Sequence, residues 1–81
     1  DYFKLLYTGL KKIDFPLDII KKYYLHDSKR WDIEVSNKII IKLPVENYIK
    51  SLKNFMYLMN EKNFEEFKLF DYRINNQLIL K

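Results

Sequence analysis

Side chains that could do acid–base or nucleophilic chemistry are sparse in this chain, and their spacing does not group them. His26 is the only histidine, so no histidine pair could bind a metal ion and no catalytic triad could form around a serine. Glu65 and Glu66 are adjacent, and adjacent residues of a strand point to opposite faces of a sheet. The chain has no cysteine, which excludes disulfides and thiolate metal ligands. We therefore expect no catalytic, cofactor-binding or metal site, and we expect His26 to be a solvated turn residue.

One charged pair stands in the C-terminal stretch FDYRINNQLILK. Asp71 and Arg73 are two residues apart, so in a strand both side chains lie on the same face. Two interpretations are open: the two side chains pair with each other, or they face a partner protein. For Asp71 we favour the internal ion pair, and for Arg73 both interpretations stay open on spacing alone.

Length and composition indicate one folded domain over residues 1–81 with a small basic excess. Hydrophobic residues make up 48% of the 81 residues, which is enough for a modest core. The net charge of +4 would suit nucleic acid, although no run of five basic residues occurs. A small basic α+β nucleic-acid-binding module is therefore the alternative function. No apolar run approaches the roughly 18 residues of a membrane helix, so we expect any membrane anchor upstream of Asp1.

The stretch RWDIEVSNKIIIKLP predicts a β-hairpin, and burial decides its register. A two-residue loop would put two lysines on the face of Trp31. A three-residue loop at 36–38 makes that face wholly apolar, with these pairs: Trp31 with Leu43, Ile33 with Ile41 and Val35 with Ile39. It also places Asp32 opposite Lys42. Lys38 would then take a left-handed conformation, at a cost of roughly 1 kcal/mol relative to glycine. Trp31 is expected in the core.

Three other stretches complete the expected elements before the C-terminal one. VENYIKSLKNFMYLMNEK predicts a long amphipathic helix directly after Pro44. Its apolar stripe is Val45, Tyr48, Ile49, Leu52, Phe55, Met56 and Met59. YFKLLYTG alternates imperfectly and predicts a strand that stops at Gly9, whereas FPLDIIKKYYL is ambiguous between helix and strand.

The stretch FDYRINNQLILK predicts a second hairpin with a three-residue loop at 75–77. That loop would give these pairs: Tyr72 with Leu80, Ile74 with Leu78 and Asp71 with Lys81. A two-residue loop would instead put Gln77 and Lys81 on the apolar face. The predicted fold is α+β: an antiparallel or mixed β-sheet, a long amphipathic helix packed on one face, and a C-terminal edge hairpin. An edge strand leaves backbone groups unpaired, and a partner strand could pair with them.

Two of these stretches resemble one protein family. KRWDIEVSNKIIIKLP resembles the C-terminal periplasmic β domain of the FtsQ/DivIB bacterial cell-division family, where an arginine-tryptophan strand, an Asn-Gly turn and a strand ending in Leu-Pro precede a helix. FDYRINNQLILK is similar to that family's Asp-Leu-Arg segment and final hairpin, and YFKLLYTG to its strand ending in Thr-Gly or Val-Gly. Lys38 and Tyr72 depart from the family's glycine and leucine. The interval from Gly9 to Trp31 is also short for the helix and strand expected there, so that helix is short or residues are missing.

The resemblance implies a non-enzymatic scaffold of the divisome, with no cofactor, small-molecule substrate or nucleic acid. The domain would be the periplasmic part of a single-pass inner-membrane protein at the division septum, after a membrane helix and a POTRA domain. It would bind FtsB and FtsL, accept a strand of FtsB on its last strand and help control septal wall synthesis. Arg73 would contact a partner acid, and Ile74, Leu78 and Leu80 would form the apolar floor beneath the partner strand.

Overall fold

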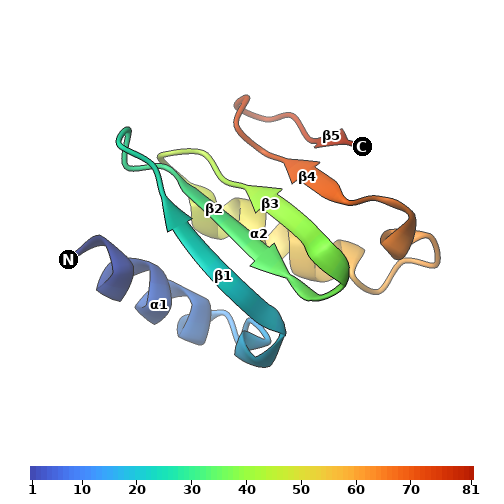
Figure 1. The fold of residues 1–81 in the computed structure, drawn as a ribbon, viewed down its shortest axis with the longest axis horizontal. Helices are drawn as coiled ribbons and strands as arrows, with labels where there is room; N and C mark the ends of the chain where they lie inside the picture. Colours follow the sequence, from blue (N-terminus) through green and yellow to red (C-terminus); the bar gives the residue numbers. More distant parts are fainter.

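The computed structural model describes residues 1–81, which form an α+β fold with a five-stranded mixed sheet and two α-helices (Figure 1). The strands lie in the order β1-β2-β3-β4-β5. Their bounds are Ile20–Leu25, Trp31–Val35, Ile39–Lys42, Leu69–Asp71 and Ile79–Leu80. Helix α1 spans Tyr2–Lys12, helix α2 spans Tyr48–Leu58, and 3₁₀ turns cover Leu17–Ile19, Ser36–Lys38 and Phe64–Glu66. All neighbouring strands are antiparallel except β3 and β4, whose parallel pairing needs the long crossover that contains α2.

Strands β2 and β3 form the predicted hairpin in the predicted register. The pairs Val35–Ile39 and Ile33–Ile41 are present, and the Leu43 N–H donates to the Trp31 carbonyl at 3.0 Å. The apolar face of this hairpin is almost entirely buried: Trp31, Ile33, Val35, Ile39, Ile41 and Leu43. The turn needs two left-handed residues, because φ is 63° at Asn37 and 62° at Lys38. Burial of one face therefore sets the register, as the sequence predicts.

The N-terminal segment is a helix, so the strand predicted there is wrong. The carboxylate of Asp1 caps α1 by accepting two backbone N–H groups of the first turn, at 2.9 and 3.2 Å. Leu6 and Leu10 lie one turn apart and are fully buried. Gly9 does not end the element but lies inside it, against the side chain of Ile49. This helical spacing of buried leucines outweighs the β-forming tendency of the aromatic residues around them.

Helix α2 is shorter than the predicted long helix and has 11 residues. It does not start directly after Pro44, because Asn47 precedes it in a left-handed conformation with φ of 61°, which a helix cannot continue through. Val45, which the predicted stripe included, lies outside the helix and is exposed. The remaining stripe faces the sheet. Leu52 and Phe55 are fully buried, and the Phe55 ring lies edge-on to Phe70 of β4, with centroids 4.9 Å apart.

Strands β4 and β5 pair in a register that differs from the predicted one. The observed pairs are Phe70 with Leu80 and Asp71 with Ile79. The predicted three-residue loop at 75–77 is wrong, because Tyr72 leaves the β4–β5 ladder. The Tyr72 N–H donates to the Lys42 carbonyl at 2.8 Å, and the Tyr72 hydroxyl donates to Asn54 Oδ1 at 2.8 Å. Residues 72–78 therefore form an irregular connection rather than the extension of two strands.

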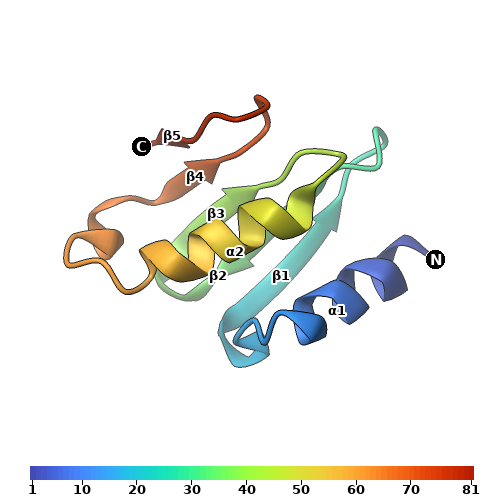
Figure 2. The same ribbon diagram turned by 180° about the vertical axis from the view of Figure 1, so that it is seen from behind.

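The molecule has two layers, and both helices lie on the same side of the sheet. Figure 2 shows α2 in front of the sheet and α1 alongside β1, and Figure 1 shows the opposite sheet face without any helix over it. One hydrophobic cluster fills the space between the layers, and its aromatic members include Phe15, Trp31, Phe55, Phe70 and Tyr72. The uncovered sheet face is where the charged side chains of the strands lie, since residues alternate between faces along each strand.

Candidate partner-binding edge and its charged face

The four residues predicted to bind a partner lie at the C-terminal end of the sheet, but they do not form one continuous floor. Leu80 belongs to β5, whereas Arg73, Ile74 and Leu78 lie in the connection that precedes it. Ile74 is 52% exposed and Leu80 is 37% exposed. Leu78 is half-buried and packs against the hydrophobic cluster. Ile74 therefore lies outside β4, in which it was predicted to lie. Only Leu78 and Leu80 line the β5 edge.

The outer edge of β5 carries an unpaired backbone donor and acceptor. Leu69 and Lys81 exchange two hydrogen bonds, with N···O distances of 3.1 and 3.2 Å. In an antiparallel ladder the next residue along the strand points both of its backbone groups the other way. The N–H and C=O of Leu80 therefore point away from β4. Because β5 ends the sheet order, no strand within residues 1–81 pairs with them.

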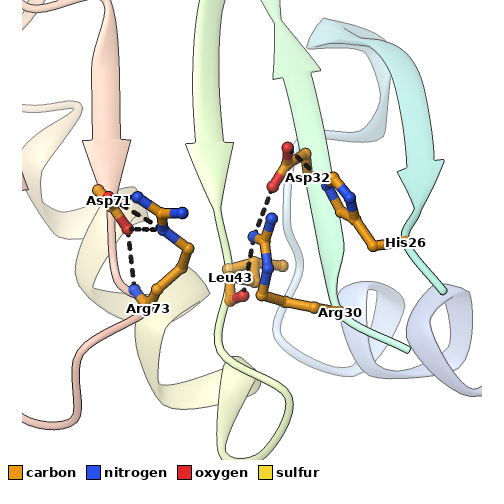
Figure 3. Close-up of polar contacts among 6 residues, drawn as sticks. All are labelled: His26, Arg30, Asp32, Leu43, Asp71 and Arg73. Atoms are coloured by element: carbon orange, nitrogen blue, oxygen red, sulfur yellow. Dashed lines mark hydrogen bonds and ion pairs between the residues drawn. The ribbon is translucent and has the colours of Figure 1, made fainter. Parts of the chain in front are cut away.

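Asp71 and Arg73 form a forked ion pair on the uncovered face of the sheet (Figure 3). Arg73 Nε donates to both carboxylate oxygens at 2.9 and 3.1 Å, and Nη2 donates to Oδ2 at 2.6 Å. The Arg73 backbone N–H donates to the same carboxylate at 3.0 Å. These hydrogen bonds lower the pKa of Asp71 below its ordinary value. The guanidinium keeps Nη1 without a partner, and the Arg73 side chain remains 47% exposed.

A second ion-pair cluster lies on the same face, around Asp32 of β2. Arg30 Nη1 donates to Asp32 Oδ1 at 2.6 Å and lies 3.3 Å from the Leu43 carbonyl oxygen. His26 Nε2 is 2.9 Å from Asp32 Oδ2. His26 is therefore not a free turn residue as expected. The sequence did hold the signal, since Arg30 and Asp32 have the same two-residue spacing as Asp71 and Arg73.

The sheet register connects the two clusters through Lys42. Lys42 of β3 lies opposite Asp32 on one side and beside Asp71 on the other. Figure 3 shows Arg30 and Arg73 approaching the Leu43 end of β3 from its two sides. A cation thus lies beside both carboxylates, the buried Asp71 and the partly exposed Asp32.

A polar cleft of about 480 Å³ lies between the start of α2 and the connection from β4 to β5. Tyr72 contributes to its wall, and burial raises the pKa of the Tyr72 phenol. Most of the other lining side chains are amides, hydroxyls or charged groups: Glu46, Asn47, Lys50, Ser51, Asn54, Asn75, Asn76 and Gln77. These neutral and charged groups offer hydrogen bonds but no nucleophile paired with a base.

The structure contains no cluster of three or more histidine, aspartate or glutamate side chains that could hold a metal ion. None of its helices combines the length and the apolar character that crossing a bilayer requires. No protein-family model matches the chain, and no curated protein and no solved structure matches it.

Proposed function

We propose that this domain is a non-enzymatic protein-binding module that accepts an extended segment of a partner along the outer edge of β5. The observation that carries the proposal is the outward-facing N–H and C=O of Leu80 at the end of the sheet. A strand added there would satisfy both groups, and its side chains would supply selectivity. Leu78 and Leu80 offer apolar contacts beside this backbone site.

The resemblance to the FtsQ/DivIB family supports a specific partner for this edge. The hairpin of β2 and β3 and the segment from Phe70 to Lys81 carry that resemblance; the N-terminal part is lost because Tyr2–Lys12 is helical. On this proposal the domain is the periplasmic part of a single-pass inner-membrane division protein. It binds FtsB and FtsL at the septum and helps control septal wall synthesis, and a strand of FtsB occupies the β5 edge.

Arg73 is the residue proposed to bind an acidic side chain of that partner. A strand added to β5 would lie roughly 10 Å from β4, two strand spacings away. Figure 3 shows the Arg73 guanidinium on the β3 side of β4, so the side chain would have to turn away from β3 to reach a glutamate of that strand. The contact with a partner acid therefore competes with the pair that holds the guanidinium at Asp71.

A titration with a peptide of the FtsB segment tests this function. Arg73→Glu and Leu80→Asp, each checked for folding by circular dichroism, are expected to weaken binding at least about tenfold. Because Arg73→Glu brings a second acid next to Asp71, Arg73→Gln is a milder second variant. Lys62→Glu, an exposed charge change far along the chain from this edge, is the matched control. Unchanged affinity in the folded Arg73 and Leu80 variants would exclude the assignment.

The backbone at Leu80 allows a sharper test. Leu80→Pro removes the N–H that points outward, while the β4 ladder uses the backbone groups of Lys81 and Ile79 instead. Leu80→Ala removes the side chain and keeps the N–H. Strand addition predicts weaker binding for the proline variant than for the alanine variant. Equal affinities, or oligonucleotide binding with a steep salt dependence, would instead favour a different mode or the nucleic-acid module.

A further inference from the structure

The two helices carry a charge distribution that the β5 edge does not explain. Together α1 and α2 contain five exposed lysines and no aspartate or glutamate: Lys4, Lys11, Lys12, Lys50 and Lys53. The carboxylates of the chain lie in the strands, in the turns and before each helix. The charges of the helices are therefore all positive, whereas the uncovered sheet face carries both signs and includes the ion pairs of Asp32 and Asp71.

Large apolar side chains lie exposed among these lysines. Leu5 on α1 and Tyr57 on α2 are each 66% exposed, more than any other large hydrophobic residue. Tyr2 and Tyr7 of α1 are exposed as well. The two helices form one surface, because Gly9 lets α1 approach Ile49 of α2 closely. Figure 2 shows α2 over the sheet and α1 alongside β1.

We propose that the outer surface of α1 and α2 binds the headgroup region of an anionic lipid bilayer. Lysines on a helical surface are attracted to anionic headgroups, and their long apolar stems let the ammonium groups reach the phosphates. The exposed leucine and tyrosine side chains would insert at the membrane–water interface, at the level of the headgroups. A purely electrostatic contact would not use such side chains. This interaction leaves the edge of β5 free, since that edge lies at the far end of the sheet from α1 (Figure 1).

A lipid surface fits this layer better than nucleic acid does. Arginine makes the bidentate contacts that nucleic-acid recognition favours, and both arginines of the chain lie off the helices, held by Asp32 and Asp71. The helical layer has lysine only, a point charge suited to a fluid array of headgroups. The apolar Leu5 side chain makes no favourable contact with a phosphate backbone, whereas it can insert at the boundary of the acyl chains in a bilayer.

Cosedimentation of the 81-residue chain with vesicles tests the proposal. The chain is expected to bind phosphatidylcholine vesicles that contain phosphatidylglycerol but not vesicles of pure phosphatidylcholine. Binding to the anionic vesicles is expected to weaken as salt is added. Lys4→Glu combined with Lys53→Glu is expected to weaken binding at least tenfold, since each lysine near such a surface contributes about a fivefold factor. Glutamate at position 4 lies in the first turn of α1, where the helix dipole favours it.

The matched control is Lys62→Glu combined with Lys68→Glu, which makes the same change in net charge at exposed positions outside both helices. It is expected to bind vesicles within about twofold of the unchanged chain. An equal loss of vesicle binding in both double variants would show that binding depends on net charge rather than on the helical surface, and it would overturn the surface assignment. Equal binding to vesicles with and without the anionic lipid would overturn it too.

Leu5→Ser separates a lipid surface from nucleic acid. It removes the most exposed aliphatic side chain of α1 and leaves every charge in place. Vesicle binding is expected to fall several-fold. Single- and double-stranded oligonucleotides serve as the competing probes. If they bind more tightly than the anionic vesicles, and Leu5→Ser leaves both unaffected, the layer is a nucleic-acid surface and the proposal fails.

Discussion

Arg73 clamps the carboxylate of Asp71 through Nε and Nη2, and the two side chains differ sharply in exposure. The side chain of Asp71 is 8% exposed and that of Arg73 is 47% exposed. A buried acid is thus neutralised by an arginine that still faces solvent. The arrangement explains why an acid can stand in the last residue of β4, where its neighbour Phe70 belongs to the core.

The Asp71–Arg73 pair predicts a pH-dependent contribution to stability. Asp71→Asn is expected to lower the free energy of unfolding by about 1–3 kcal/mol at neutral pH, because it removes a charge-assisted hydrogen-bonded acceptor from a buried site. The folded-state pKa of Asp71 lies below its ordinary value. The stabilisation is therefore complete above the unfolded pKa of about 3.9 and is lost as pH falls through the lower folded value.

Urea unfolding at a series of pH values measures this effect. The gap between the unchanged chain and Asp71→Asn is expected to narrow as pH falls from about 7 to about 3. Asp27→Asn, at an exposed turn residue that makes no side-chain hydrogen bond or ion pair, is the control. A gap that stays constant with pH would show that Asp71 does not carry a charge-dependent interaction.

The cluster around Asp32 predicts unequal costs for its two ends. Asp32→Ala leaves the largely buried Arg30 without its carboxylate, whereas His26→Ala removes one hydrogen bond and keeps the ion pair. We expect Asp32→Ala to cost about 1–2 kcal/mol more than His26→Ala in urea unfolding. Equal losses would mean that Arg30 finds sufficient compensation from the Leu43 carbonyl, which it already approaches.

The sequence predicted the parts of the fold in which burial alone determines the answer. The hairpin of β2 and β3 has one face where every residue is apolar, so a one-residue slip would expose three large side chains. No such constraint acts on residues 72–78. There Tyr72 turns from the ladder toward Asn54, a long-range hydrogen bond that the local pattern of residues cannot reveal.

The N-terminal helix escaped prediction for a related reason. Leu6 and Leu10 define a helical face, but the aromatic residues around them favour a strand by propensity. The packing of α1 against α2 and β1 decides between the two, and that packing depends on elements far along the chain. Of the residues predicted to bind a partner, Leu80 lies on the open edge, Arg73 points toward β3, and Ile74 lies outside any strand because β4 ends at Asp71.

The turn between β2 and β3 predicts a stabilising substitution. Lys38 holds a φ of 62° although a side chain is strained there. Lys38→Gly removes that strain and adds flexibility to the unfolded chain, so the net gain is expected to be about 0.5 kcal/mol. Asn37→Gly is the matched control, because asparagine tolerates a left-handed conformation and its gain is expected to be smaller. The midpoint of urea unfolding measures both, and a loss of stability in Lys38→Gly would contradict the prediction.

Gly9 and Ile49 predict a coupling between the two helices. A Cβ on Gly9 would stand 2.5 Å from the Cδ1 atom of Ile49, so Gly9→Ala forces that side chain to move. Alanine is favoured over glycine within a helix by about 1 kcal/mol, and the clash offsets this gain. In the Ile49→Ala background the clash is absent. Gly9→Ala is then expected to stabilise the chain by about 1 kcal/mol more than it does in the unchanged sequence.

A double-mutant cycle of the four chains by urea unfolding measures that coupling. Thr8→Ala, at an exposed position of the same helix, is the control and is expected to act the same way in both backgrounds. A coupling near zero between Gly9 and Ile49 would mean that α1 does not pack closely on α2. It would also remove the single helical surface on which the proposed lipid contact depends, since Leu5 and Tyr57 would then move independently.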